Sequence, residues 1–242
     1  MSRYVFLAVA LLPWPAGAEQ LQEMPSVTIV AARDAEWGSY RHAYKAAARY
    51  ERATRSRPLI QAHMQIRPRQ PGLSVEGLRI ELTGKTSALT IEVDAIGRAT
   101  LPLLKQAYDE DAVLRLNRQA GFYRFSGRFT IREKDDGVYD AAVLRAACEQ
   151  LLSAQREDGS LFRMWGKKCV GVRFIYPLAS SDSAIEFRAG GKAGAIPAAD
   201  GLPFEGGNMD LYKVATYRFA DWPQAGEVIA EKRPLAIGTL YE

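Results

Sequence analysis

Runs of alternating apolar and polar residues dominate the middle of the chain. Such a run places one set of side chains on a core and the other set in water, as in a half-buried antiparallel sheet. The runs lie at residues 59–69, 78–84, 89–94, 112–118 and 123–132. Turn signals rich in Gly, Asp or Pro separate them, and several short strands spaced in this way are typical of a β-sandwich. The pattern therefore predicts an antiparallel sandwich with one face in water.

Two other segments follow the 3.6-residue period of amphipathic helices. The first covers residues 34–55, with Asp34 or Ser39 as its expected N-cap, tyrosines and alanines on one side, and cationic residues on the other. The second covers residues 138–155 and carries a stripe of Ala, Leu and Cys. The fold class that we predict is therefore α+β: an antiparallel β-sandwich with an N-terminal amphipathic helix and a second helix.

Composition divides the chain into three parts. Residues 1–18 look like a signal peptide, and residues 19–177 carry the helices and the sandwich strands. In residues 178–242, strand-like pieces flank a stretch rich in Gly, Ala and Pro. The pattern leaves open whether this last part is a small β-rich appendage or supplies extra strands to the same domain.

The first residues predict export. A positively charged start precedes a continuous apolar run at residues 4–12, and the small residues Ala16 and Ala18 fit the cleavage pattern of a secretory signal peptide before Glu19. The run is shorter than the roughly 20 apolar residues that span a bilayer, and no later stretch approaches that length. We therefore expect a periplasmic or secreted mature chain without a transmembrane segment.

Export changes the meaning of the two cysteines, Cys148 and Cys169. In an oxidising compartment, two cysteines of one domain are expected to pair. A structural zinc site usually needs four ligands, and two thiols without other soft ligands do not supply them. The sequence thus predicts a disulfide that ties the second helix to the strand that follows it.

Motifs of hydrolases, metalloenzymes and nucleotide-binding proteins are missing from the sequence, so we predict no metal and no cofactor. A nucleophilic site needs a base beside its nucleophile. The two histidines, His42 and His63, lie on different predicted elements. We expect His63 to be a solvated residue on the polar side of its strand, and neither histidine to be essential.

Two runs of acidic residues suggest an alternative function as a hydrolase. The carboxylates are Asp109, Glu110 and Asp111 in the first run and Asp135, Asp136 and Asp140 in the second. A glycosidase uses two carboxyl groups across a cleft, so an envelope-glycan hydrolase is the alternative function. Asp also favours turns and helix starts, and we prefer this structural interpretation of both runs.

Cationic residues on the polar sides of the first helix and of the strands predict a basic face. They are Arg41, Lys45, Arg52 and Arg55 on the helix and Arg115, Arg124, Arg128 and Arg132 on the strands. Such a face attracts anions, and a solvated surface balanced by nearby acids is the alternative. The formal net charge of +4 is too small to decide between them.

The compartment narrows the choice of partner. An exported protein rarely meets nucleic acid, and no aromatic stacking platform accompanies the cations. We therefore expect an anionic envelope polymer or another envelope protein as the partner, and no nucleic acid. The leading expectation is a non-catalytic exported protein that binds or supports a cell-envelope component.

Two segments carry a resemblance to known proteins. The stretch IEVDAIGRATLPL at residues 91–103 resembles a segment of prealbumin-like sandwiches, with a strand, an Asp-x-x-Gly turn, a second strand and a Leu-Pro edge. The layout of residues 40–177, which ends in a G-V-x-F strand at residues 171–174, is similar to that of a family of exported proteobacterial proteins of unknown function. The resemblance implies a sandwich fold and export, and it implies no activity.

We predict that the mature protein begins at Glu19, because the small residues at positions 16 and 18 form the cleavage site. Mass spectrometry of the protein taken from its native host should find Glu19 as the first residue. Exported material that still carries Met1 would contradict this prediction.

Overall fold

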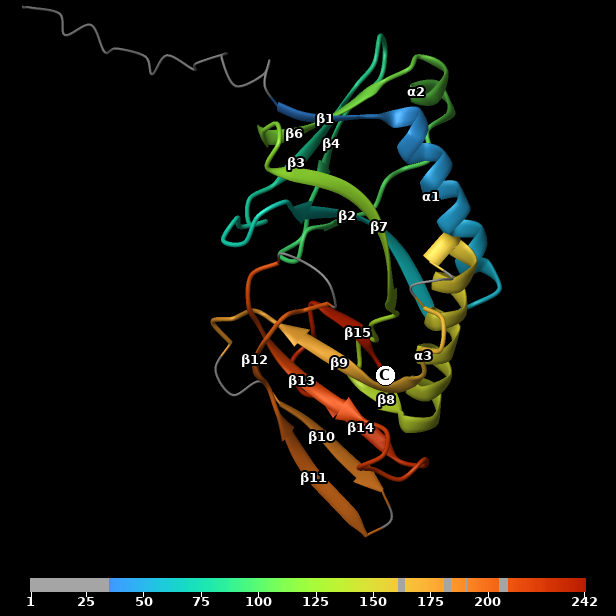
Figure 1. Cartoon of the computed structure of the whole chain (residues 1–242), viewed down its shortest axis with the longest axis vertical. Coiled ribbons are helices and arrows are strands. Elements are labelled where there is room, and N and C mark those ends of the chain that lie inside the picture. The colour runs from blue at the N-terminus through green and yellow to red at the C-terminus, as the bar shows by residue number, and fades with distance from the viewer. Residues whose placement is uncertain (1–34, 161–163, 181–183, 190, 205–208) are drawn as a thin grey trace, which may run out of the picture.

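The computed structural model describes residues 35–160, 164–180, 184–189, 191–204 and 209–242, so the expected signal peptide and Asp34 lie outside the described residues. The fold is the predicted α+β class, with antiparallel sheets and helices along one side of the molecule (Figure 1). The helices are α1 (Tyr40–Arg55), the short α2 (Lys105–Asp109) and α3 (Ala141–Gln155), which continues into a π-helical turn, η2 (Arg156–Ser160).

Three antiparallel sheets make up the rest of the described chain. The largest has seven strands in the order β12 (Ala199–Gly201), β13 (Tyr212–Arg218), β9 (Cys169–Tyr176), β15 (Ala236–Tyr241), β7 (Tyr123–Ile131), β2 (Ile60–Pro68) and β5 (Arg98–Ala99). One four-stranded sheet has the order β1 (Ala35–Ser39), β6 (Val113–Gln119), β3 (Arg79–Thr83) and β4 (Ala88–Glu92). The other has the order β11 (Lys192–Pro197), β10 (Ala184–Ala189), β14 (Glu227–Ala230) and β8 (Val138–Asp140).

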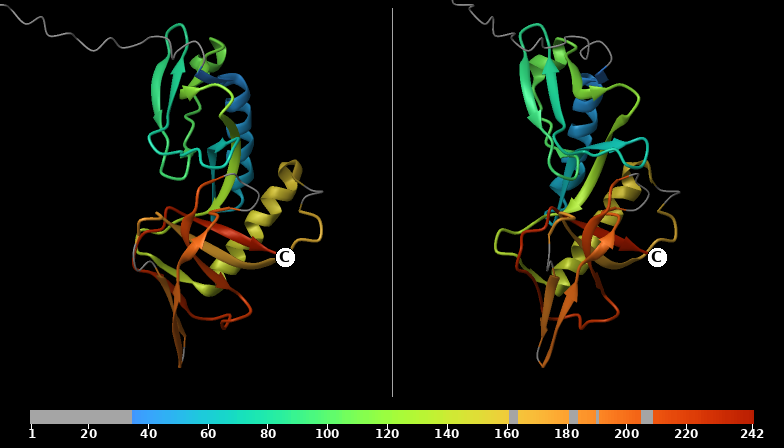
Figure 2. Two further views of the ribbon diagram at one scale, coloured as in Figure 1. Left: turned by 60° about the vertical axis from the view of Figure 1, so that its left-hand side comes forward. Right: turned by 90° about the vertical axis from the view of Figure 1, so that its left-hand side faces the viewer.

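The pairing of β2 with β7 joins the two ends of the molecule. The ladder runs without a break from Ile60 opposite Ile131 to Pro68 opposite Tyr123. In all three views these two strands cross the middle of the fold, between the sheet of β1, β3, β4 and β6 and the strands of the C-terminal third (Figures 1 and 2). The C-terminal third takes part in the large sheet, because β15 pairs with both β7 and β9.

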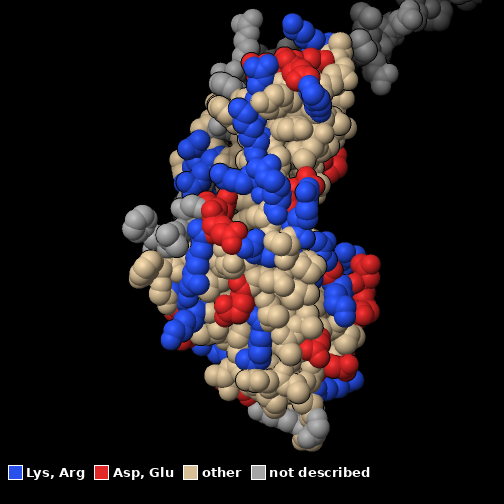
Figure 3. Space-filling model, turned by 90° about the vertical axis from the view of Figure 1, so that its right-hand side faces the viewer, with Lys and Arg blue, Asp and Glu red and all other residues tan. Residues whose placement is uncertain are grey.

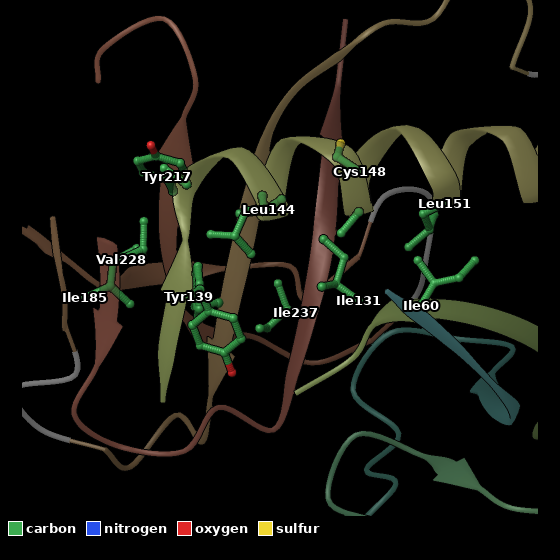
Figure 4. Close-up of a cluster of buried hydrophobic side chains, with 14 of the residues drawn as sticks. Ile60, Ile131, Tyr139, Leu144, Cys148, Leu151, Ile185, Tyr217, Val228 and Ile237 are labelled. Atoms are coloured by element: carbon green, nitrogen blue, oxygen red, sulfur yellow. The ribbon is translucent and has the colours of Figure 1, made fainter. Parts of the chain in front are cut away.

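Two hydrophobic cores lie at the two ends of the β2–β7 ladder. One collects Ile60 and Ile131 with the buried stripe of α3 and with strands β8, β10 and β14, and Figure 4 shows Leu144 and Leu151 of α3 above Ile237, Ile131 and Ile60. The other collects Ile66 and Tyr123 with the four-stranded sheet of β1, β3, β4 and β6. Successive residues of β9 enter different cores, so that strand is covered on both faces.

Burial on both faces corrects one part of the sequence interpretation. The alternation in β2 and β7 predicted a polar face in water, but Gln65 and Thr130 are 0% exposed. The Gln65 side chain donates a hydrogen bond from Nε2 to the Ile96 carbonyl at 2.6 Å. The side chains of Gln65 and Thr130 are therefore buried rather than solvated, and that of Gln65 is held by a hydrogen bond.

Both long helices begin later than the sequence predicted, because the preceding residues pair as strands. Residues 35–39 form β1 against β6, and α1 starts at Tyr40 with Ser39 as an N-cap whose side chain makes no capping bond. Residues 138–140 form β8 against β14, and α3 starts after Asp140. The Asp140 carboxylate accepts hydrogen bonds from the amides of Ala142 and Val143, which caps α3.

The turn at residues 94–97 has the expected Asp-x-x-Gly form. One carboxylate oxygen of Asp94 accepts hydrogen bonds from the amides of Ile96 and Arg98 at 3.1 and 2.7 Å. Gly97 has a φ of 79°, in the left-handed region that favours glycine. The turn leads the chain from β4 in one sheet to β5 in the other.

The predicted disulfide between Cys148 and Cys169 is present, with a Cα–Cα distance of 6.0 Å. It ties α3 to the first residue of β9. Within the described residues, no helix has the length and apolar character needed to cross a membrane.

We predict that replacing both cysteines, as Cys148→Ala with Cys169→Ala, lowers the free energy of unfolding by about 2–5 kcal/mol, because the bridge restricts the unfolded chain. Urea unfolding of the oxidised parent and of the variant measures the difference. As a control, the parent in excess reductant should lose a similar amount. Equal stability of all three samples would contradict the prediction.

Candidate functional site

Helix α1 separates two surfaces of different character. Its inner side packs on the sheets through Tyr40, which is 0% exposed, and through the half-buried Tyr44 and Tyr50. This is the stripe that the sequence pattern predicted. Its outer side carries cations and faces water. Each side has its own candidate function.

Aromatic contacts fix the inner side at both ends of α1. The Tyr40 hydroxyl donates a hydrogen bond to the Pro102 carbonyl at 2.6 Å and accepts one from the Leu104 amide. At the other end, the Tyr50 ring lies edge-on to Phe129, with the ring centroids 4.9 Å apart. A Cβ at position 127 would overlap the Tyr50 ring, so this contact requires Gly127.

A groove of about 610 Å³ runs beneath α1 and passes beside Tyr50, bounded by α1 on one side and by β2, β7 and residues 100, 101 and 103 on the other. The helix contributes only small side chains to its middle, namely Ala43, Ala46 and Ala47. Both histidines line it, so the structure brings together His42 and His63, which the sequence analysis had placed on different elements.

The outer side of α1 carries part of the predicted basic face. Lys45 and Arg52 are exposed, and neither has a carboxylate partner among the described residues. Arg55 pairs with Glu51 at 3.4 Å. Arg41 has a structural task, because its guanidinium donates to the carbonyls of Tyr108 and Asp109 at the end of α2.

Figure 3 views the molecule from the side that carries the helices. Lys and Arg side chains form a broken band down this face, with Asp and Glu side chains beside it at the top, in the middle and below. The band is a local feature, since the chain as a whole carries a formal net charge of only +4.

The four strand arginines of the predicted basic face do not join this band as one surface. Arg115 lies on β6 opposite Glu81, and Arg124 lies opposite Arg67. The expectation that Arg128 points into water is wrong, because its guanidinium lies 3.9 Å from the Phe204 ring centroid and its Nε is buried. Arg132 is exposed, but it lines the groove on the inner side of α1.

The expectation that His63 is solvated is also wrong. Its Nε2 is buried and has no hydrogen-bond partner among the described residues. Burial, and after it the positive charge of Arg98, lower the pKa of His63 to about 4, against the opposing effect of Glu133 and Asp94. A histidine with this pKa is neutral at physiological pH.

The charges beside His63 form an ionic cluster that the sequence did not reveal. Arg98 pairs with Asp94 at 2.7 Å and with Glu133 at 2.8 Å, and it donates to the Leu235 carbonyl. The side chains of Arg98 and Glu133 are 11% and 10% exposed. Because these partners come from the 94–98 turn, the end of β7 and the residue before β15, the cluster fastens three distant segments together.

The acidic runs behave as the structural interpretation expected. Asp140 caps α3, Asp136 accepts from the Val138 amide, and Asp109 pairs with Lys105. Hydrogen bonds from the Thr86 side chain, and then from backbone amides, lower the pKa of Glu110 to about 2, so this carboxyl group stays ionised and cannot serve as a general acid.

Neither run lines the groove, and the two runs lie on separate elements. Within the described residues no group of His, Cys, Asp and Glu side chains is arranged to hold a metal ion.

No protein-family model, curated protein or solved structure matches this chain. The resemblance to prealbumin-like sandwiches and to an exported proteobacterial family therefore stays a prediction. What the chain does must be inferred from the two sides of α1.

We predict that His63, which is half-buried and neutral, makes the protein acid-sensitive. The unfolded chain takes up this proton near pH 6.5 and the folded chain only near pH 4, so stability falls as the pH drops between these values. His63→Gln should remove about 2 kcal/mol of the stability loss between pH 7 and pH 4.5. Urea unfolding at both pH values measures it.

His42→Gln is the matched control, because His42 is exposed on the rim of the same groove. Carboxylates such as Glu133 and Asp94 titrate in every variant, so their contribution cancels in the comparison. If the parent and His63→Gln lose the same free energy on acidification, the half-buried, neutral histidine is not the cause.

Proposed function

We propose that this protein is an exported, non-catalytic protein that binds an anionic component of the cell envelope through the outer side of α1. The observation that carries the proposal is the band of cations along that helix, in which Lys45 and Arg52 are exposed without carboxylate partners among the described residues (Figure 3).

The disulfide supports the exported location. Structural disulfides persist in oxidising compartments and are rare in the cytosol. The bond between Cys148 and Cys169 joins a buried helix residue to a strand of the large sheet, so it belongs to the folded core and not to an exposed redox motif.

The geometry of α1 supports binding by charge rather than by insertion into a lipid surface. Interfacial helices bury Trp, Phe and Leu, whereas the large side chains of α1 face the protein's own sheets. The cations stand on a helix whose inner side is fixed by Tyr40 and Tyr50, so they are held at a constant spacing. Attraction of this kind is screened over about 8 Å at physiological ionic strength, so binding should weaken with salt.

The alternative, an envelope-glycan hydrolase, gains no specific support. A glycosidase needs a protonated carboxyl group and an ionised one across a cleft. The acidic runs that suggested it serve a cap, a turn and surface ion pairs.

We predict that the double variant Lys45→Gln with Arg52→Gln binds deacylated lipopolysaccharide about three- to tenfold more weakly than the parent at low salt, because exposed charges each contribute modestly. Isothermal titration calorimetry at two salt concentrations measures the binding. The thermal midpoint should change little, since both side chains are exposed and the contact of the Lys45 ammonium with the Tyr108 ring, at 5.9 Å from its centroid, lies at the surface.

The control is Arg115→Gln, which removes one exposed cation from β6, a strand that pairs with β1 and lies outside α1. It should leave binding within twofold of the parent. If the parent does not bind at low salt, or if the double variant binds as the parent does, the basic side of α1 is only a solvated surface.

A further inference from the structure

The groove beneath α1 changes in character along its length. At one end it is lined by Leu101, Leu103 and Phe125. At the other end it is lined by Thr54, Gln61, Arg132 and Glu51, and the Glu51 carboxylate pairs with Arg55 at 3.4 Å. The alanines of α1 form the wall between these ends. The lining along the helix extends from Ser39 to Thr54, which is about 22 Å at the rise of an α-helix. A long, largely apolar passage therefore leads to a polar end that holds Arg132 and the Glu51 carboxylate, which is paired with Arg55.

Aromatic side chains keep the groove from closing. Alanines alone would let the helix settle onto the sheet, because small side chains permit close approach. Tyr40 and Tyr50 act as spacers at the two ends, the first bonded to Pro102 and Leu104 and the second packed against Phe129 over Gly127. The open volume is thus a consequence of Tyr40 and Tyr50 on either side of the alanines that line the groove, while Tyr44 packs against Tyr108 outside the groove lining.

Arg132 supplies the charge at the polar end. Its Nε and Nη2 each donate to a backbone carbonyl, of Pro58 and of Ile60, at 3.2 Å. These two bonds hold the guanidinium in place without neutralising it, and no carboxylate of the described residues lies within ion-pair distance. The neighbouring Glu133 is engaged with Arg98 and Gln61. A guanidinium is well suited to binding a carboxylate with parallel hydrogen bonds.

We propose that the groove binds a long-chain carboxylate, with the hydrocarbon chain along the alanines of α1 and the carboxylate at Arg132. A volume of about 610 Å³ falls within the range of small-molecule sites. The chain removes apolar surface from water along the groove. The carboxylate gives Arg132 the counterion that the described residues do not provide. This site lies on the inner side of α1 and does not depend on the anion binding proposed for the outer side.

The other ligand classes fit the groove less well. A compact polar metabolite would leave the alanine and leucine walls exposed to water. A neutral hydrocarbon chain would fill the walls but leave Arg132 without a counterion. Both the chain and the anionic group are therefore part of the prediction.

Three probes separate the contribution of the hydrocarbon chain from that of the carboxylate. They are hexadecanoate, hexanoate and hexadecanol, each titrated below its solubility limit into the parent protein. Hexadecanoate should bind at least tenfold more tightly than either of the others, since hexanoate lacks most of the chain and hexadecanol lacks the charge. A parent that does not bind hexadecanoate, or that binds hexadecanol equally well, overturns the proposal.

Two pairs of variants locate the site. Arg132→Gln should weaken hexadecanoate binding at least tenfold, whereas Arg124→Gln, an exposed arginine of β7, should not change it. Ala46→Leu should fill the groove and weaken binding at least tenfold, whereas Ala48→Leu adds the same side chain outside the groove lining and should not. Thermal unfolding checks that each variant is folded.

Unchanged binding in Ala46→Leu, or equal loss in the two leucine variants, overturns the proposal even if Arg132→Gln fails to fold. The Lys45→Gln/Arg52→Gln variant should bind hexadecanoate as the parent does. Hexadecanoate binding by this variant therefore tests the groove proposal separately from the proposal that the outer side of α1 binds anions.

Discussion

The unbroken pairing of β2 with β7 is the constraint on which the rest of the fold depends. One end of the ladder enters the core beneath α3 and the other enters the core beneath the sheet of β1, β3, β4 and β6. Because side chains alternate along a strand, a slip of one residue would exchange the two faces along both strands. Gln65 would then lose its bond to Ile96, and Gly127 would no longer lie under Tyr50. Both the core and the groove are tied to this register.

Periodicity alone could predict the fold class, the two long helices and the buried stripe of each. It failed where residues 35–39 and 138–140 precede a helix, because pairing with β6 and β14 decides their structure and both partners are distant in sequence. It failed again at His63, Gln65 and Thr130, because alternation identifies a polar side but does not show what covers that side. The disulfide was predictable, since two cysteines in an oxidising compartment allow one intramolecular pair.

The candidate site was predictable only in part. We propose a binding role for each side of α1, and the sequence pattern predicted only the basic outer side. The cations of α1 predicted a basic face, whereas its alanines predicted only a stripe that packs on the sheets. A signal was nevertheless present in the sequence: the alanines at positions 46–48 lie between Tyr44 and Tyr50, and such a mixture of small and large side chains cannot pack evenly against a sheet. The assignment of Arg132 to the inner side required the fold. Arg124, Arg128 and Arg132 follow one another at a spacing that predicts a shared face, yet Arg124 lies opposite Arg67, Arg128 lies over the Phe204 ring, and Arg132 lines the groove.

The position of β15 has a consequence for how the chain reaches its folded state. This strand lies between β9 and β7, in the interior of the large sheet, although it is the last strand described along the sequence. Until residues 236–241 are available, β7 and β9 have no partner on their facing edges, and Ile237 is missing from the core beneath α3. The large sheet therefore closes only after this segment has been synthesised.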